Sequence, residues 1–180
     1  MATWQAVSSL IEVLKTIPVS VIPADHIGLR RPTRRADLPA IVVSMGEVTE
    51  TPIGIGGWLG SGQAVPGQWV EATGSKAVGT LSVELWTAGA EDVAPIADAL
   101  FAALATGQTT LRSAGFVKFG NRAIKPVDAA TVAKQSALMM VIDYAVTYEE
   151  VKTATTGPGG IIQQVQVGVA GEFNEQMKIP

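Results

Sequence analysis

The chain has 180 residues, a formal net charge of −3 at pH 7, a charged fraction of 16% and no cysteine. The absence of thiols excludes a disulfide framework and a thiolate metal site, and the net charge gives no overall attraction to nucleic acid or to an anionic membrane. This length favours one domain with a sizeable core, and the low charge with a mean hydropathy of +0.30 predicts apolar surface buried against other subunits.

The first predicted element is an amphipathic helix over residues 3–16. Apolar side chains recur there at intervals of three and four, which places them on one stripe: Trp4, Val7, Leu10, Ile11 and Leu14. Thr3 is suited to the N-cap position, where its hydroxyl would accept a hydrogen bond from a free backbone N–H. We expect this helix to pack on a sheet.

An arginine-rich loop follows in residues 26–39, HIGLRRPTRRADLP, which lack apolar periodicity. The loop carries Arg30, Arg31, Arg34 and Arg35. Guanidinium forks suit carboxylates and phosphates, so three interpretations stay open: a solvated loop, ion pairs between subunits, or contact with nucleic acid. We prefer the first two interpretations to the third.

The next segment, residues 38–44, is a nearly continuous apolar run rich in β-branched side chains. Such a run predicts a central strand that is shielded on both faces. Residues 51–67 concentrate glycine and proline and predict a long loop or a protruding hairpin, with a short strand at residues 68–72 on its far side.

The clearest unit is a strand at residues 76–86 that leads into a helix at residues 92–105. Leu81, Val83 and Leu85 fall on alternate positions, and after residue 92 the apolar period changes to that of a helix. Asp92 is the predicted N-cap, and Gly107 is the predicted left-handed C-terminal cap. We expect this helix to cover the apolar face of the sheet.

Two further strands are predicted, at residues 115–119 and 138–148, with a polar connection between them. After residue 150 the composition changes to TATTGPGG, which predicts a hinge at residues 157–160. Apolar side chains then alternate with glutamine and glycine at Ile161, Val165, Val167 and Val169. We expect an α+β domain at residues 1–151, and in residues 152–180 a hinge and an extended arm that acts between molecules.

The sequence offers no catalytic set. His26 stands beside Asp25 in a loop, but no serine lies in a G-x-S-x-G setting, so we interpret it as a solvated loop histidine. A single histidine without cysteine serves zinc poorly. The acidic pairs at residues 91–92 and 149–150 show no facing arrangement for acid–base catalysis. We therefore expect neither catalytic residues nor a metal site.

The sequence predicts no cofactor and no membrane insertion either. The glycines of GIGGWLG at residues 54–60 miss the dinucleotide spacing, and no Gly-Lys-Ser/Thr follows a glycine loop. No apolar run approaches the length that crosses a bilayer, and residues 1–10 lack a basic region followed by an apolar one. We expect a soluble chain without a signal peptide.

Taken together, these segments resemble the tail terminator, or tail completion, proteins of long-tailed bacteriophages. Three stretches carry the resemblance, which spans about residues 4–151: DLPA at residues 37–40, the strand-to-helix unit at residues 81–104, and YAVTYE at residues 144–149. Members of that family are non-enzymatic α+β proteins. The resemblance implies the same fold class as the patterns above, from which we expect one mixed or antiparallel sheet with two packed helices. The protruding glycine-rich loop at residues 51–67 and the extended C-terminal arm, also expected from the patterns, exceed the shortest family members.

The resemblance also implies a role and a location. Family members form a hexameric ring on the finished tail tube, stop its polymerisation and provide the surface that joins the neck of the head. The implied partners are further copies of the chain, the tail tube protein, a neck or head-completion protein and, in contractile tails, the sheath. DNA would pass through the ring without sequence-specific contact, and some of the four arginines would face that lumen or bridge adjacent subunits. The implied location is the head-proximal end of the virion tail, with assembly in the host cytoplasm.

Two other classes of protein stay open at this level. One is another structural protein of the tail, such as a tube, sheath-adjacent or baseplate component; tube proteins usually contain two large sheets that close a barrel. The other is a small-ligand enzyme, which would show a pocket with perturbed ionisable groups.

Overall fold

The computed structural model describes residues 2–65, 68–156 and 162–168. Within these residues the chain forms one mixed, seven-stranded sheet and three α-helices, which is the predicted α+β class. The helices are α1 (Ala2–Leu14), α2 (Val93–Thr106) and α3 (Gln108–Ser113). The strands are β1 (Ile27–Gly28), β2 (Ala40–Val65), β3 (Gln68–Thr87), β4 (Phe116–Ile124), β5 (Asp128–Val132), β6 (Gln135–Thr156) and β7 (Ile162–Gly168).

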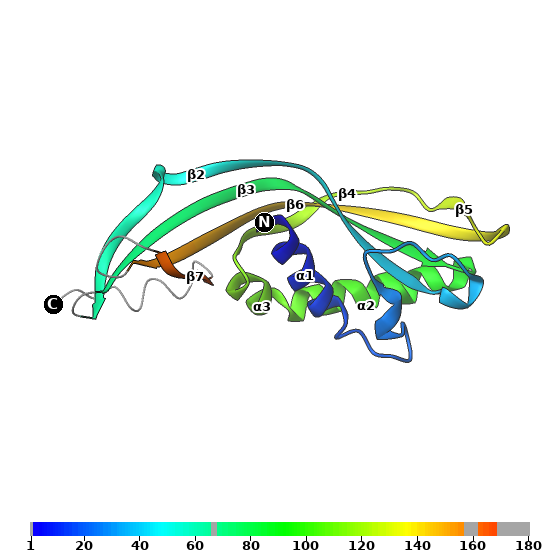
Figure 1. Ribbon diagram of the computed structural model, residues 1–180. Helices are drawn as coiled ribbons and strands as arrows, with labels where there is room; N and C mark the ends of the chain where they lie inside the picture. Colours follow the sequence, from blue (N-terminus) through cyan, green and yellow to red (C-terminus); the bar gives the residue numbers. More distant parts are fainter. Residues whose placement is uncertain (1, 66–67, 157–161, 169–180) are drawn as a thin grey trace.

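Three long strands, β2, β3 and β6, run side by side through the sheet (Figure 1). The strand order is β1-β2-β3-β6-β4, and β5 and β7 pair with separate parts of β6. Among the described strands, β1 and β2 alone are parallel. The β3–β6 ladder continues without a register shift from Trp69 opposite Thr156 to Thr87 opposite Leu138. Alternate side chains therefore keep to the same face along this whole length.

One face of the sheet, called the helix face below, packs against the helices and holds the main core. The sheet arches over α1, α2 and α3, which lie under its concave side (Figure 1). Leu81, Val83 and Leu85 are buried on this face in one cluster with Leu10 of α1 and Leu100 of α2. The predicted packing of two helices on the strands at residues 38–44, 76–86 and 138–148 is confirmed.

The opposite side, called the outer face, carries a second and smaller apolar cluster. Ala40 and Val42 of β2 are buried there with Trp86 of β3, whereas Ile41 and Val43 point into the main core. The beginning of β2 is therefore covered on both faces, as its run of apolar residues predicts.

The helix ends differ from the sequence predictions. Because α1 begins at Ala2, Thr3 lies inside the helix and is not its N-cap. Asp92 occupies the N-cap position of α2 but makes no side-chain capping bond.

Gly107 is not a left-handed cap, because its φ is −79° and the chain continues directly into α3, a helix that was not predicted. A Cβ at Gly107 would overlap Val13 Cγ1. The glycine therefore allows α1 to approach closely.

Residues 51–67 were predicted as a loop or a protruding hairpin, and the described residues 51–65 form a strand of a hairpin. β2 runs on to Val65, so the predicted end at residue 44 was too early, and the separate strands at 68–72 and 76–86 are parts of β3. Ile53 lies opposite Gly74 and Trp58 opposite Thr73, so residues 54–57 bulge out of the ladder. Glycines at positive φ absorb this bulge without ending the strand. We call residues 51–65 and 68–76 the hairpin arm; it extends beyond the helices (Figure 1).

The connection predicted between residues 119 and 138 contains additional strand. The predicted strand at 115–119 is the first part of β4, and β5 follows it before the chain turns into β6. That turn places Ala133 and Lys134 at φ values of 50° and 66°. Hairpin turns of this kind usually contain Asn-Gly or Asp-Gly, so the sequence lacked the usual signal.

Candidate interaction surfaces

Arg31 anchors the arginine-rich loop to the outer face of the sheet. Its Nε and Nη2 donate to the two carboxylate oxygens of Glu84 at 2.9 and 2.6 Å, and the indole Nε1 of Trp86 donates to Glu84 Oε2 at 2.9 Å. The Glu84 side chain is only 8% exposed. The hydrogen bond to Glu84 raises the pKa of Arg31 above its ordinary value. A bidentate pair between a guanidinium and a buried carboxylate is among the strongest hydrogen-bonded contacts in proteins, so this contact is structural.

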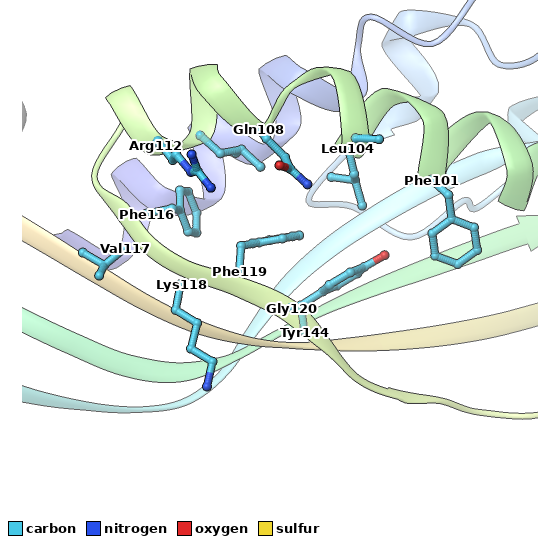
Figure 2. Close-up of a pocket in the computed structure, with 12 residues that line it drawn as sticks. Phe101, Leu104, Gln108, Arg112, Phe116, Val117, Lys118, Phe119, Gly120 and Tyr144 are labelled. Carbon is cyan, nitrogen blue, oxygen red and sulfur yellow. The ribbon is translucent and has the colours of Figure 1, made fainter.

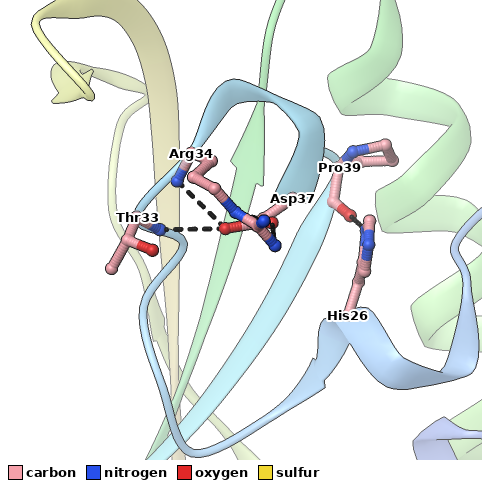
Figure 3. A network of polar contacts seen from close by, with 5 residues as sticks. All are labelled: His26, Thr33, Arg34, Asp37 and Pro39. Carbon is pink, nitrogen blue, oxygen red and sulfur yellow. Dashed lines mark hydrogen bonds and ion pairs between the residues drawn. The ribbon is translucent and has the colours of Figure 1, made fainter.

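Arg34 makes a local contact within the same loop (Figure 3). The backbone N–H groups of Thr33 and Arg34 donate to Asp37 Oδ2 at 3.3 and 3.0 Å, and the Arg34 guanidinium donates to Asp37 Oδ1. The side-chain hydrogen bond from Arg34, assisted by the backbone bonds, lowers the pKa of Asp37. These bonds hold a short 3-10 turn at Arg35–Asp37 that leads into β2.

The two remaining arginines are less constrained. Arg35 Nη1 donates to Gln135 Oε1 at 3.3 Å, whereas the exposed Arg30 makes no side-chain hydrogen bond or ion pair with any described residue. The structure thus places Arg31 and Arg34 in intrachain pairs and leaves Arg30 the most available for a contact between subunits. A lumen or intersubunit role for the four arginines stays a prediction.

His26 is not simply solvated, as the sequence interpretation had it. The side chain is half-buried, and its Nδ1 lies 3.1 Å from the carbonyl oxygen of Pro39 (Figure 3). This distance is that of a hydrogen bond, and because a carbonyl oxygen can only accept, Nδ1 is the donor. The contact joins the start of the arginine-rich loop to its end.

The predicted intermolecular arm lies partly within the described residues. β7 pairs with the distal part of β6 in the same chain, with Val165 opposite Ala154 and Val167 opposite Lys152. Residues 157–160, predicted as the hinge, and both Ile161 and Val169 lie outside the described residues. The outer edge of β6 at residues 151–156 is therefore covered by a strand of its own chain.

The hairpin arm exposes large apolar side chains, a feature that the sequence analysis missed. Ile55 at the bulge is 84% exposed, Trp58 is 47% exposed and Trp69 is 52% exposed. The pairing register places Trp58 opposite Thr73, and Thr73 shares the helix face with Leu81. Leu59 lies on the outer face, where it packs on Gly74. The sequence contains these large apolar residues between residues 54 and 70, but glycine dominates the segment and hides any period.

A cleft of about 410 Å³ opens on the helix face between α2, α3 and the edge strand β4 (Figure 2). Apolar side chains form its walls: Phe101, Leu104, Leu111, Phe116 and Phe119. The Phe119 ring stacks on Tyr144 of β6 at a centroid distance of 4.7 Å, and Phe116 meets Phe119 edge to face at 5.6 Å. The residues come from four elements, so local sequence patterns did not indicate the cleft.

Polar side chains also line the cleft: Gln108, Arg112, Lys118 and Tyr144. The Tyr144 side chain is 1% exposed, and its hydroxyl has no hydrogen-bond partner among the described residues. In Figure 2 this hydroxyl points between Phe101 and Leu104. Burial raises the pKa of Tyr144, and burial beside Glu150 raises the pKa of Tyr148 to about 12. Both phenols stay neutral at physiological pH. Arg112, which is exposed, stands beside Phe116 at the rim (Figure 2).

The described residues contain no cluster of three or more metal-ligating side chains. No helix in the described part of the chain is long and apolar enough to cross a membrane. Comparison with known proteins found no matching family model and no match among curated proteins.

Proposed function

We propose that this chain is a structural virion protein that assembles into a hexameric ring, caps the tail tube of a long-tailed bacteriophage, ends tube polymerisation and joins the tail to the neck. The proposal combines the resemblance at residues 37–40, 81–104 and 144–149 with the architecture. Its partners would be further copies of the chain, the tube protein and a neck protein, and in a contractile tail the sheath. The ring would enclose a lumen through which DNA passes.

The observation that carries the proposal is the hairpin arm. Its Ile55, Trp58 and Trp69 side chains are exposed, and the arm that carries them extends beyond the helices that cover the main core (Figure 1). Exposed apolar surface of this kind marks a protein–protein interface, and a permanent assembly would bury it.

A second tail structural role, as a tube, sheath-adjacent or baseplate component, is the main alternative. The fold supports the terminator over a tube protein, because one sheet with helices on a single face differs from two sheets that close a barrel. A small-ligand enzyme is supported less. The cleft contains a perturbed phenol, Tyr144, but its pKa is raised, which leaves it a poor base at neutral pH.

The test is to add purified chain to tail tubes in the presence of excess tube protein. We expect electron microscopy to show a single ring at one tube end and tubes that no longer lengthen. A chain that itself polymerises into long tubes would support the tube alternative. Binding along the outer wall would support a sheath-adjacent role, and unchanged tube growth without a terminal ring would contradict the proposal.

A further inference from the structure

The hairpin arm and the cleft are separate surfaces of one molecule with matching chemistry. We propose that Trp58 of one copy inserts into the cleft of a second copy, so that subunits associate head to tail. The inference rests on the ring assembly in the proposed function and names the contact that builds it. Because the two surfaces differ, repetition of the contact closes a ring if the rotation between copies allows it.

The position of Trp58 on the hairpin arm suits its insertion into the cleft of another copy. Trp58 is 47% exposed on the helix face, and this face is concave and uncovered by helices along the arm (Figure 1). Its indole N–H has no partner within the described part of the chain. A tryptophan combines a large apolar surface with one hydrogen-bond donor, a combination typical of interface anchors.

The cleft supplies the complementary groups. Its volume of about 410 Å³ and its Phe101, Leu104 and Phe119 walls accommodate one aromatic side chain. The Tyr144 hydroxyl is buried under the cleft wall without a partner among the described residues, where it points between Phe101 and Leu104 (Figure 2), and an inserted indole would reach it by parting these two side chains. An oxygen in that state accepts an indole N–H with a net gain, because the desolvation cost of the hydroxyl is already present in the free subunit.

The charges at the two surfaces also match. Glu71 lies on the helix face of the arm, two residues along β3 from Thr73, which is opposite Trp58. Arg112 stands at the rim of the cleft. Both side chains are exposed, and neither forms an ion pair with a described residue. With Trp58 in the cleft, Glu71 of the arm would approach Arg112 of the neighbouring copy.

The edge strand β4 beside the cleft favours side-chain insertion over addition of a strand. Register shifts between Phe116 and Lys118 and between Asn121 and Ala123 interrupt its ladder with β6. Bulges on an edge strand hinder pairing with another strand. Recognition at this edge is therefore expected to depend on the cleft and not on backbone pairing.

The first test uses the absence of cysteine in the chain. The double variant Thr73→Cys/Gln108→Cys places one thiol beside Trp58 and one at the mouth of the cleft. With a short bis-maleimide cross-linker we expect a ladder of linked subunits on a denaturing gel. The matched control is Thr73→Cys/Val19→Cys, because Val19 is 71% exposed outside both surfaces. A ladder with the control only, or with neither variant, would overturn the proposal.

The second test measures association by analytical ultracentrifugation. Trp58→Ala should raise the dissociation constant at least about thirtyfold, as loss of a hot spot does. Tyr144→Phe should raise it about three- to tenfold, although the substitution removes an unsatisfied hydroxyl from the subunit. Glu71→Arg and Arg112→Glu should each raise it up to about fivefold, and the double variant with the charges exchanged should return it to the wild-type value. Val127→Ala, at another exposed apolar side chain, is the control and should change nothing.

The outcomes separate this inference from the proposed function. Normal rings on tube ends with Trp58→Ala and no cross-linked ladder would reject the contact and leave the tail role intact. A ladder and a Trp58-dependent association without any effect on tail tubes would support the contact and reject the tail role.

Discussion

The helix-covered part of the sheet and the hairpin arm share the strands β2 and β3, yet their apolar side chains have different surroundings. Near Leu81, Val83 and Leu85 the sheet is backed by α1 and α2, and the apolar side chains are buried. In the arm the same strands continue without helices, and Ile55 and Trp58 stay exposed. Apolar residues therefore have two roles in this chain: they stabilise the subunit in one half and, in our proposal, the assembly in the other.

The comparison can be tested by substitutions that should affect the folding of one region and leave the other unchanged. The expected changes in the free energy of unfolding fall from several kcal/mol in the helix-covered core to nearly zero on removal of β7.

Leu100→Ala should have the largest effect. Leu100 is 0% exposed in the main core, so its truncation should lower the free energy of unfolding by about 2–5 kcal/mol. Ile55→Ala, at the exposed bulge, is the matched control and should stay within about 0.5 kcal/mol of the wild type. Urea denaturation followed by circular dichroism measures both. Equal losses in the two variants would remove the distinction between the regions.

Gly107→Ala should have the next largest effect. The new methyl group would overlap Val13 Cγ1 and force α1 away from the α2–α3 junction, at a cost of about 1–3 kcal/mol. Gly56→Ala gives a useful contrast in the arm. Its Cβ meets open space, but its φ of 65° is strained for alanine, so a smaller loss of about 1 kcal/mol is expected. Thermal unfolding of both variants decides the order.

Arg31→Ala should cost about 1 kcal/mol. The substitution leaves the Glu84 carboxylate without its fork, but the guanidinium is 65% exposed, so solvent screening limits the loss. Arg31→Lys keeps the positive charge but not the bidentate geometry, so it should recover only part of the lost stability. Arg30→Ala is the control with no expected change. If Arg30→Ala destabilised the isolated subunit as much as Arg31→Ala, the assignment of Arg31 as the anchor would be wrong.

Asp37→Asn should have a small and pH-dependent effect. Hydrogen bonds from Arg34 depress the pKa of Asp37 in the folded chain, so its contribution is present above the unfolded value of about 3.9 and is lost as the pH falls through the folded pKa. The difference in urea midpoint between wild type and variant should thus be constant near neutral pH and shrink as the pH falls below about 3.9. A difference that grows on acidification would have the wrong sign.

Truncation after Thr156 should have the smallest effect on folding. The removed β7 pairs only with residues 151–156 of β6 among the described strands, away from the main core. We expect an unchanged circular dichroism spectrum and unfolding midpoint, together with poor tail assembly. An unfolded truncation would place the removed residues in the subunit's own core, and normal tails would make them dispensable.

The sequence alone determined the elements whose patterns are local. The strand-to-helix unit through Leu81 and Leu100, the first helix and the alternating strand at residues 138–148 follow from periods that neighbouring residues set. The start of β2 was predictable for the same reason, because a short run of β-branched residues signals burial on both faces.

The tertiary structure decided whatever depends on residues far apart in the chain. The glycines at residues 54–57 signal a break locally, but pairing with β3 carries the strand across them as a bulge. The pairing of Arg31 with Glu84 and the cleft over Tyr144 join separate elements. Local propensity contains no information on which strand or carboxylate will be the partner, because that choice is made by the packing of the whole sheet.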